Sequence, residues 1–98
     1  MEHVVITLDH FNRGSEPFYK KFQTREEAWE YVLNDADEFI DDFHLSQCET
    51  YTEGEHLYVV GEGEYGDQRL EYMIKHYSKL EEQELLDVRQ LESQGYLT

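Results

Sequence analysis

The side chains of this chain with the most evident capacity for chemistry are the carboxylates of NDADEFIDDF, residues 34–43. Five acidic residues lie there among apolar ones, with no Lys or Arg beside them. Paired carboxylates can hydrolyse glycosides when the pKa of one is raised by burial and the other stays charged. Carboxylates also bind calcium, which prefers oxygen ligands. A catalytic pair and a calcium site both require the carboxylates to converge on one point. The secondary structure of this segment therefore determines whether such a site can form or whether the carboxylates point separately into solvent.

That element is predicted to be an amphipathic helix. Thr24 followed by Glu27 predicts a capping box at its N-terminus. The apolar residues after it recur at three- and four-residue spacing: Ala28, Trp29, Val32, Leu33, Ala36, Phe39, Ile40 and Phe43. The other side of the helix collects Glu27, Glu30, Asn34, Asp37, Glu38, Asp41 and Asp42, with Glu26 and Asp35 at its margins. Helical spacing points these carboxylates outward and apart, which argues against a catalytic pair and against an EF-hand calcium site.

The loop GEGEYGD, residues 61–67, matches the dinucleotide-binding pattern G-x-G-x-x-G. No convincing helix is predicted after it, and Glu62, Glu64 and Asp67 would face the phosphates. We therefore expect an acidic hairpin loop in which these three carboxylates leave loose cation binding open. Tyr65 at the tip of the loop is a candidate exposed contact, because tyrosine is enriched among interface hot spots.

The histidines and the single cysteine are the candidate ligands for a soft metal. His44 and Cys48 are four positions apart, but nothing nearby supplies the other ligands that structural zinc requires. Cys48 is not expected to be a nucleophile, because neighbouring acids such as Asp41 and Asp42 raise the pKa of a thiol. The sequence therefore predicts no catalytic residue, no metal site and no cofactor.

The remaining segments predict strands and a second helix. Residues 3–11 and 17–22 are expected to form a hairpin, and CETYT and HLYVV a second one through Glu53-Gly54-Glu55. Residues 68–77 fit a strand or a helix face, and we favour a strand because a five-stranded antiparallel sheet then closes over two helices. Ser78 and Glu81 predict a capping box for a helix that ends at Gly95.

These elements predict one α+β domain over residues 1–98, in the order ββαβββα. In the last helix Leu86 lies off the apolar stripe and is expected to be exposed or to lie in a dimer contact. The expected core consists of Val4, Ile6, Leu8, Phe22, Trp29, Val32, Leu33, Ile40, Leu57, Val59, Leu70 and Ile74.

Charge is distributed unevenly along the chain. The net charge is −15, and residues 26–67 contain 14 of the 23 acidic residues and no Lys or Arg. This charge disfavours direct binding to nucleic acid or to an anionic membrane, and its complement is a basic protein. Neither a signal peptide nor a membrane span is predicted, and a lone cysteine fits a reducing compartment, so cytoplasm is the expected location.

Two functions fit these features. Residues 26–42 as a helix rise about 24 Å and carry eight carboxylates. Their density approaches that of DNA phosphates, about one per 3.4 Å of strand. In composition, size and charge, though in no motif, the chain resembles phage-encoded DNA mimics such as anti-restriction proteins and several anti-CRISPR proteins. The resemblance implies a non-enzymatic inhibitor of a nucleic-acid-binding protein or nuclease, acting in the host cytoplasm.

The alternative is a small acidic accessory or regulatory protein, monomeric or homodimeric, that docks on a basic partner.

Overall fold

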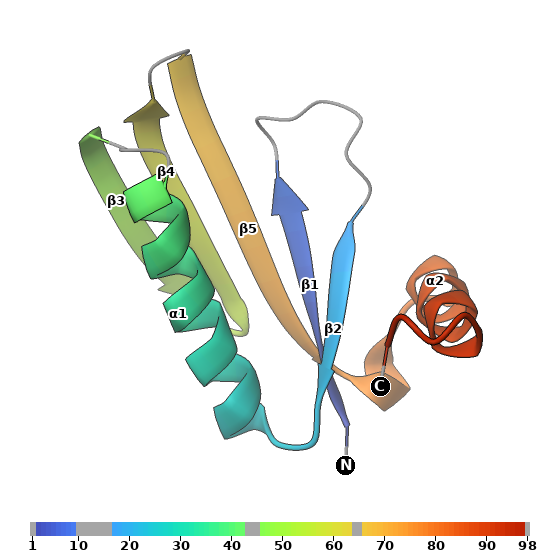
Figure 1. The fold of residues 1–98 in the computed structure, drawn as a ribbon. Coiled ribbons are helices and arrows are strands. Elements are labelled where there is room, and N and C mark those ends of the chain that lie inside the picture. Colours follow the sequence, from blue (N-terminus) through green and yellow to red (C-terminus); the bar gives the residue numbers. More distant parts are fainter. Residues whose placement is uncertain (1, 10–16, 43–45, 64–65, 98) are drawn as a thin grey trace.

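Five strands and two helices follow one another in the order ββαβββα, which confirms the predicted α+β class. The computed structural model describes residues 2–9, 17–42, 46–63 and 66–97. Its elements are β1 (His3–Asp9), β2 (Phe18–Phe22), α1 (Arg25–Asp42), β3 (Ser46–Glu53), β4 (His56–Gly63), β5 (Gly66–His76), a 3-10 turn η1 (Tyr77–Lys79) and α2 (Glu82–Ser93). The strands form one antiparallel sheet in the order β2-β1-β5-β4-β3 (Figure 1). The ambiguous segment after residue 68 is therefore a strand, as favoured from the sequence.

The two faces of the sheet bury two separate clusters, because successive strand residues point to opposite sides. In β1, Val5 points to the face that α1 covers, whereas Val4 and Ile6 point to the face that α2 covers. The α1 cluster consists of Val5, Ala28, Val32, Ala36, Leu57, Val59, Leu70, Tyr72 and Ile74. The α2 cluster consists of Val4, Ile6, Tyr19, Val88 and Leu97. Because α2 packs over β1 and β2, it leaves the same face of β3 and β4 uncovered by the described residues (Figure 1).

The predicted core is wrong at Leu33, whose surface is 52% exposed. The buried stripe of α1 is centred near Val32, between Ala28 and Ala36. At 100° per residue Leu33 lies about 100° from the centre of that stripe, beyond Trp29, which is itself only partly buried. Tyr72, which is not part of the predicted core, is 0% exposed and is the largest fully buried side chain among those described.

The second helix begins later than the sequence predicts. Ser78 lies in η1, where its backbone N–H donates to Nδ1 of His76. Leu80 is extended, and the N-cap of α2 is Glu81, whose backbone N–H donates to Oε1 of Glu84 at 2.9 Å. The predicted pairing of Ser78 with Glu81 is therefore replaced by a pairing of Glu81 with Glu84. The predicted C-terminal stop is confirmed, because Gly95 has a φ of 81°, which favours glycine.

Candidate functional site

Among its described side chains, the helix α1 presents six exposed carboxylates on the side turned away from the sheet. One half of the predicted capping box is present at its N-terminus, where the backbone N–H of Glu27 donates to Oγ1 of Thr24 at 3.1 Å. In place of the reciprocal bond, the Thr24 hydroxyl donates to Oε1 of Glu27 at 3.1 Å. Apolar spacing then fixes which side of the helix faces the core, and the polar positions are left in solvent. We call the exposed set the α1 acidic face; its members are Glu26, Glu27, Glu30, Asp37, Glu38 and Asp41.

No ion pair between described residues involves the α1 acidic face, whereas acids elsewhere are paired with bases. Lys75 Nζ lies 2.8 Å from Glu84, and Lys21 Nζ lies 3.4 Å from Glu92. Arg25, the basic residue of α1, points to the β3–β4 turn, where its Nη2 atom donates a hydrogen bond of 2.7 Å to Oε1 of Glu55. This hydrogen bond lowers the pKa of the Glu55 carboxyl. Apart from the attraction between Glu26 and its neighbour Arg25, the negative charge of the α1 acidic face is therefore not paired with a base in the described part of the molecule.

Asp35 does not belong to this face, although the sequence placed it at its margin. Its carboxylate accepts a hydrogen bond of 2.6 Å from the hydroxyl of Tyr72 in β5. The six remaining carboxylates extend over residues 26–41, a rise of roughly 22 Å or about one charge per 4 Å. Asp35 lowers this density relative to the value expected from the sequence, because its carboxylate is hydrogen-bonded to Tyr72.

The second predicted acidic segment lies at the same end of the molecule as the C-terminus of α1 (Figure 1). Ser46, the first residue of β3, pairs with Glu62 near the end of β4, and Glu62 is exposed. The backbone of Asp67 lies in β5. Glu64 and Tyr65 fall outside the described residues, so their predicted contacts stay predictions. The fold thus places the C-terminus of α1 and the last residues of β4 at one end of the molecule, although they are far apart in sequence.

The described residues form no group of three or more His, Cys, Asp or Glu side chains that could hold a metal ion. Cys48 is partly buried and packs against the α1 cluster, while His44, the other candidate ligand, lies outside the described residues.

None of the described helices is long and apolar enough to cross a membrane. Comparisons of the chain with protein-family models, with curated proteins and with solved structures found no match.

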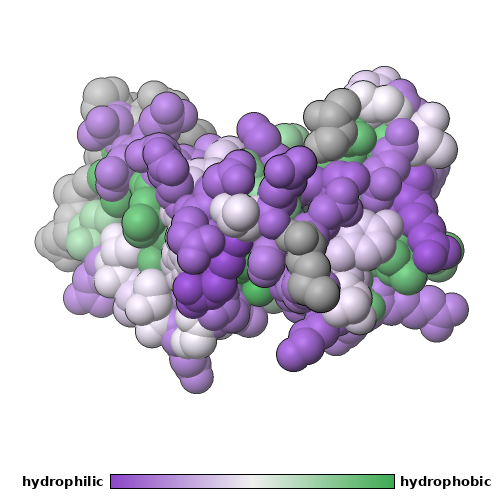
Figure 2. Space-filling model, turned by 90° about the horizontal axis from the view of Figure 1, so that it is seen from below, coloured by the Kyte–Doolittle hydropathy of each residue, from purple (hydrophilic) through white to green (hydrophobic). Residues whose placement is uncertain are grey.

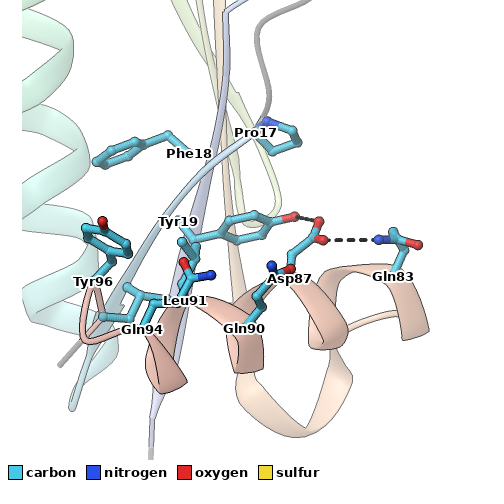
Figure 3. A pocket seen from close by; sticks show the side chains of 10 residues that line it. Pro17, Phe18, Tyr19, Gln83, Asp87, Gln90, Leu91, Gln94 and Tyr96 are labelled. Atoms are coloured by element: carbon cyan, nitrogen blue, oxygen red, sulfur yellow. Dashed lines mark hydrogen bonds between the residues drawn. The ribbon is translucent and has the colours of Figure 1, made fainter.

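A groove that the sequence did not reveal lies between β2 and α2, with a volume of about 730 Å³ (Figure 3). At its base Asp87 accepts hydrogen bonds from the hydroxyl of Tyr19 at 2.9 Å and from Nε2 of Gln83 at 3.0 Å. Phe18 and Tyr96 line it and are 61% and 76% exposed. Its described lining offers amides, aromatic rings and a carboxylate that is already hydrogen-bonded, so it provides packing area and no nucleophile.

Hydrophilic residues cover most of the molecular surface at the end where α1 begins, and apolar residues form small separate patches there (Figure 2). A surface of this kind offers little apolar area to a partner. Recognition through it must therefore depend mainly on charge and hydrogen bonding.

Added salt is expected to stabilise the folded protein. The net charge of −15 and the unpaired α1 acidic face disfavour the compact state through repulsion. Raising ionic strength from about 0.01 M to about 0.1 M shortens the Debye length from roughly 30 Å to 10 Å. A gain of about 1 kcal/mol in the free energy of unfolding would raise Tm by roughly 4–8 °C. Thermal melting followed by circular dichroism at the two salt concentrations measures this change.

The matched control for the salt effect is the double variant Glu30→Gln, Asp37→Asn. It keeps the size and polarity of both side chains but removes two charges from the α1 acidic face. We expect this variant to melt at a higher temperature than the parent at low salt and to gain less from added salt. A Tm that falls as salt is added would contradict the electrostatic interpretation.

Proposed function

We propose that this protein is a non-enzymatic binding module that acts in the cytoplasm, the host cytoplasm if it is phage-encoded. In this proposal its α1 acidic face occupies the cationic groove of a nucleic-acid-binding protein or nuclease in place of nucleic acid. The proposal is supported by a difference between the acidic residues of α1 and those in the rest of the domain. The exposed carboxylates of α1 have no ion pair in the described structure, whereas the basic residues Lys21, Arg25 and Lys75 are engaged by acids elsewhere.

This arrangement reduces the local stability of the helix. Like charges at i and i+4, as at Glu26 and Glu30 or at Asp37 and Asp41, each destabilise a helix by about 0.2–0.5 kcal/mol. Acids near a helix C-terminus also interact unfavourably with the macrodipole, and no basic residue lies in the last turn of α1. A cationic groove would convert these repulsions into attraction, release counterions from the partner and accelerate association.

Leu33 favours the second candidate function, a small acidic accessory protein that docks on a basic partner without imitating nucleic acid. Glu30, Leu33, Asp37 and Asp41 recur at three- and four-residue spacing and so share one stripe of the helix surface. The half-exposed leucine within this stripe offers an apolar contact that a phosphate backbone lacks. The two functions differ in one testable respect: only a mimic must compete with nucleic acid for the same groove.

The experiment begins with capture of partners from a cell lysate on the immobilised protein. Each captured protein is then purified and bound to fluorescently labelled duplex DNA, and the present protein is added. For a mimic we expect stoichiometric displacement of the DNA, with an affinity that falls steeply as salt increases. The double variant Glu30→Lys, Asp37→Lys should bind the captured partner about 100-fold more weakly, because two attractions become repulsions.

The control variant carries the same change in net charge on α2 and its C-cap residue Gln94. Glu82→Lys changes the charge by two units, and Gln90→Lys and Gln94→Lys change it by one unit each, which equals the four units of the α1 variant. All three positions are exposed. Equal weakening by both variants would show that net charge, rather than the α1 acidic face, determines binding. Binding of the partner without displacement of its nucleic acid would favour the accessory function over mimicry.

A further inference from the structure

The side of the sheet opposite α1 is uncovered at β3 and β4. The strand register places Tyr51 of β3 directly opposite Tyr58 of β4, and Tyr58 opposite Glu71 of β5. In the same way Glu49 pairs with Val60, and Val60 with Arg69. Side chains two residues apart in a strand share a face. We call this surface the open sheet face; its members are Glu49, Tyr51, Glu53, Tyr58, Arg69 and Glu71.

A preformed aromatic stack lies at the centre of the open sheet face. The rings of Tyr51 and Tyr58 are nearly parallel, with an interplanar angle of 18° and centroids 4.9 Å apart. His56 fixes the inner ring, since its Nδ1 lies 3.1 Å from the Tyr58 hydroxyl. β3 is the edge strand of the sheet, so the ring face of Tyr51 that is turned away from Tyr58 has no further strand beside it. Tyr51 is 46% exposed.

The inner ring of the stack already binds a guanidinium group. The Cζ atom of Arg69 lies 5.6 Å from the centroid of the Tyr58 ring, within the range of a cation–π interaction. Two carboxylates influence this ring: burial is the largest cause of the raised pKa of the Tyr58 hydroxyl, and the charges of Glu71 and Glu53 raise it further. Among the described residues, the inner ring therefore has both a guanidinium group and carboxylates near it.

The outer ring, that of Tyr51, also has carboxylates beside it, but no guanidinium group of the described residues is stacked on it. Glu49 and Glu53 lie two residues on either side of Tyr51, point to the same face and are exposed. Neither has an ion pair among the described residues. A planar guanidinium can stack on a tyrosine ring while it donates hydrogen bonds to a carboxylate, whereas a lysine ammonium does both less well. The charge complement of this surface is therefore an arginine.

We propose that the outer ring face of Tyr51, together with the carboxylates of Glu49 and Glu53, binds an arginine side chain of the basic partner. The proposal rests on the proposed function for the basic character of that partner. It uses the opposite side of the sheet from α1, so the two surfaces can be tested separately. A partner that contacts both would hold the edge of the sheet at β3 between two cationic segments.

The probe is a short peptide of alternating glycine and arginine, titrated into the 15N-labelled protein and followed by NMR. We expect the amide signals of Tyr51, Glu53 and Tyr58 to shift, and the lysine peptide of equal length to bind more weakly. Tyr51→Ala should weaken the arginine peptide about 3-fold and should remove its advantage over lysine. Tyr51→Phe keeps the ring and should bind as the parent does.

The matched control is Tyr96→Ala, which removes a tyrosine that is 76% exposed and lies outside the open sheet face. It should leave the affinity of the peptide unchanged. Equal affinity for the two peptides, or unchanged affinity in Tyr51→Ala, would overturn the proposal. Shifts confined to α1 would overturn it while leaving the proposed function intact. Shifts at β3 and β4, combined with no effect of the α1 reversals on a captured partner, would instead contradict the proposed function.

Discussion

Replacement of Tyr72 by Ala is expected to lower the free energy of unfolding by about 3–5 kcal/mol, as for other large aromatic side chains truncated in a core. The total stability of a domain is only about 5–15 kcal/mol. Tyr72 is 0% exposed and lies on β5, between the paired strands β1 and β4 and beneath α1. Truncation would leave a cavity at the centre of the α1 cluster. Urea unfolding followed by circular dichroism measures the loss.

The variant Tyr72→Phe separates packing from hydrogen bonding at this position. It retains the ring but removes the hydroxyl that donates to Asp35 at 2.6 Å. Loss of one partner of a hydrogen bond to a charged group costs about 1–3 kcal/mol. Because Asp35 is only partly buried, water can replace part of the lost interaction, and we expect a value near the lower end.

Tyr96→Ala is the control for truncation of a tyrosine, because its side chain is exposed and its loss should change stability by less than about 0.5 kcal/mol. If Tyr72→Phe were as destabilising as Tyr72→Ala, the hydrogen bond rather than the packed ring would dominate. A loss below about 1 kcal/mol in Tyr72→Ala would show that the ring does not support the core in solution.

The second large effect is expected at alkaline pH, where stability should fall steeply above about pH 10. Burial raises the pKa of the Tyr72 and Tyr19 hydroxyls above the ordinary value, and the hydrogen bond that each donates to an aspartate raises it further. In the unfolded chain both hydroxyls lose their protons near pH 10, whereas in the folded state they remain protonated. The stabilisation is thus complete below the unfolded pKa and is lost as pH rises from there towards the raised folded values.

Each such tyrosine contributes a limiting slope of about 1.4 kcal/mol per pH unit, so the two together contribute about 2.8 kcal/mol per unit. This slope applies where both hydroxyls are ionised in the unfolded chain and protonated in the folded protein, and it is large relative to a total stability of about 5–15 kcal/mol. Urea unfolding at a series of pH values gives the slope directly.

The double variant Tyr19→Phe, Tyr72→Phe should be less stable at neutral pH but should lose stability more slowly above pH 10, because neither position can ionise. Tyr51→Phe, at an exposed position, serves as the control and should follow the parent curve. Parallel curves for the parent and the double variant would show that other groups cause the alkaline loss.

Local sequence patterns predicted the order of the elements, although residues 68–77 fitted either a strand or a helix and the start of α2 was predicted too early. Alternation in β1 and the three- and four-residue spacing of α1 are local patterns that depend on the geometry of a strand or a helix alone. The same periodicity placed Glu30, Asp37 and Asp41 on the solvent side of α1, where they are exposed. The separation of acidic from basic residues along the chain was likewise visible without coordinates.

Only the tertiary structure decided which side chains near the margins of each face are buried, paired or free. Leu33 and Asp35 both border the apolar stripe of α1, yet the aspartate turns inward because the hydroxyl of Tyr72, 37 residues away, offers it a hydrogen bond. The stack of Tyr51 on Tyr58 depends on the register of one hairpin. Periodicity along a chain specifies the direction of a side chain, but its partner comes from another element, so contacts of this kind exist only once the sheet and helices have assembled.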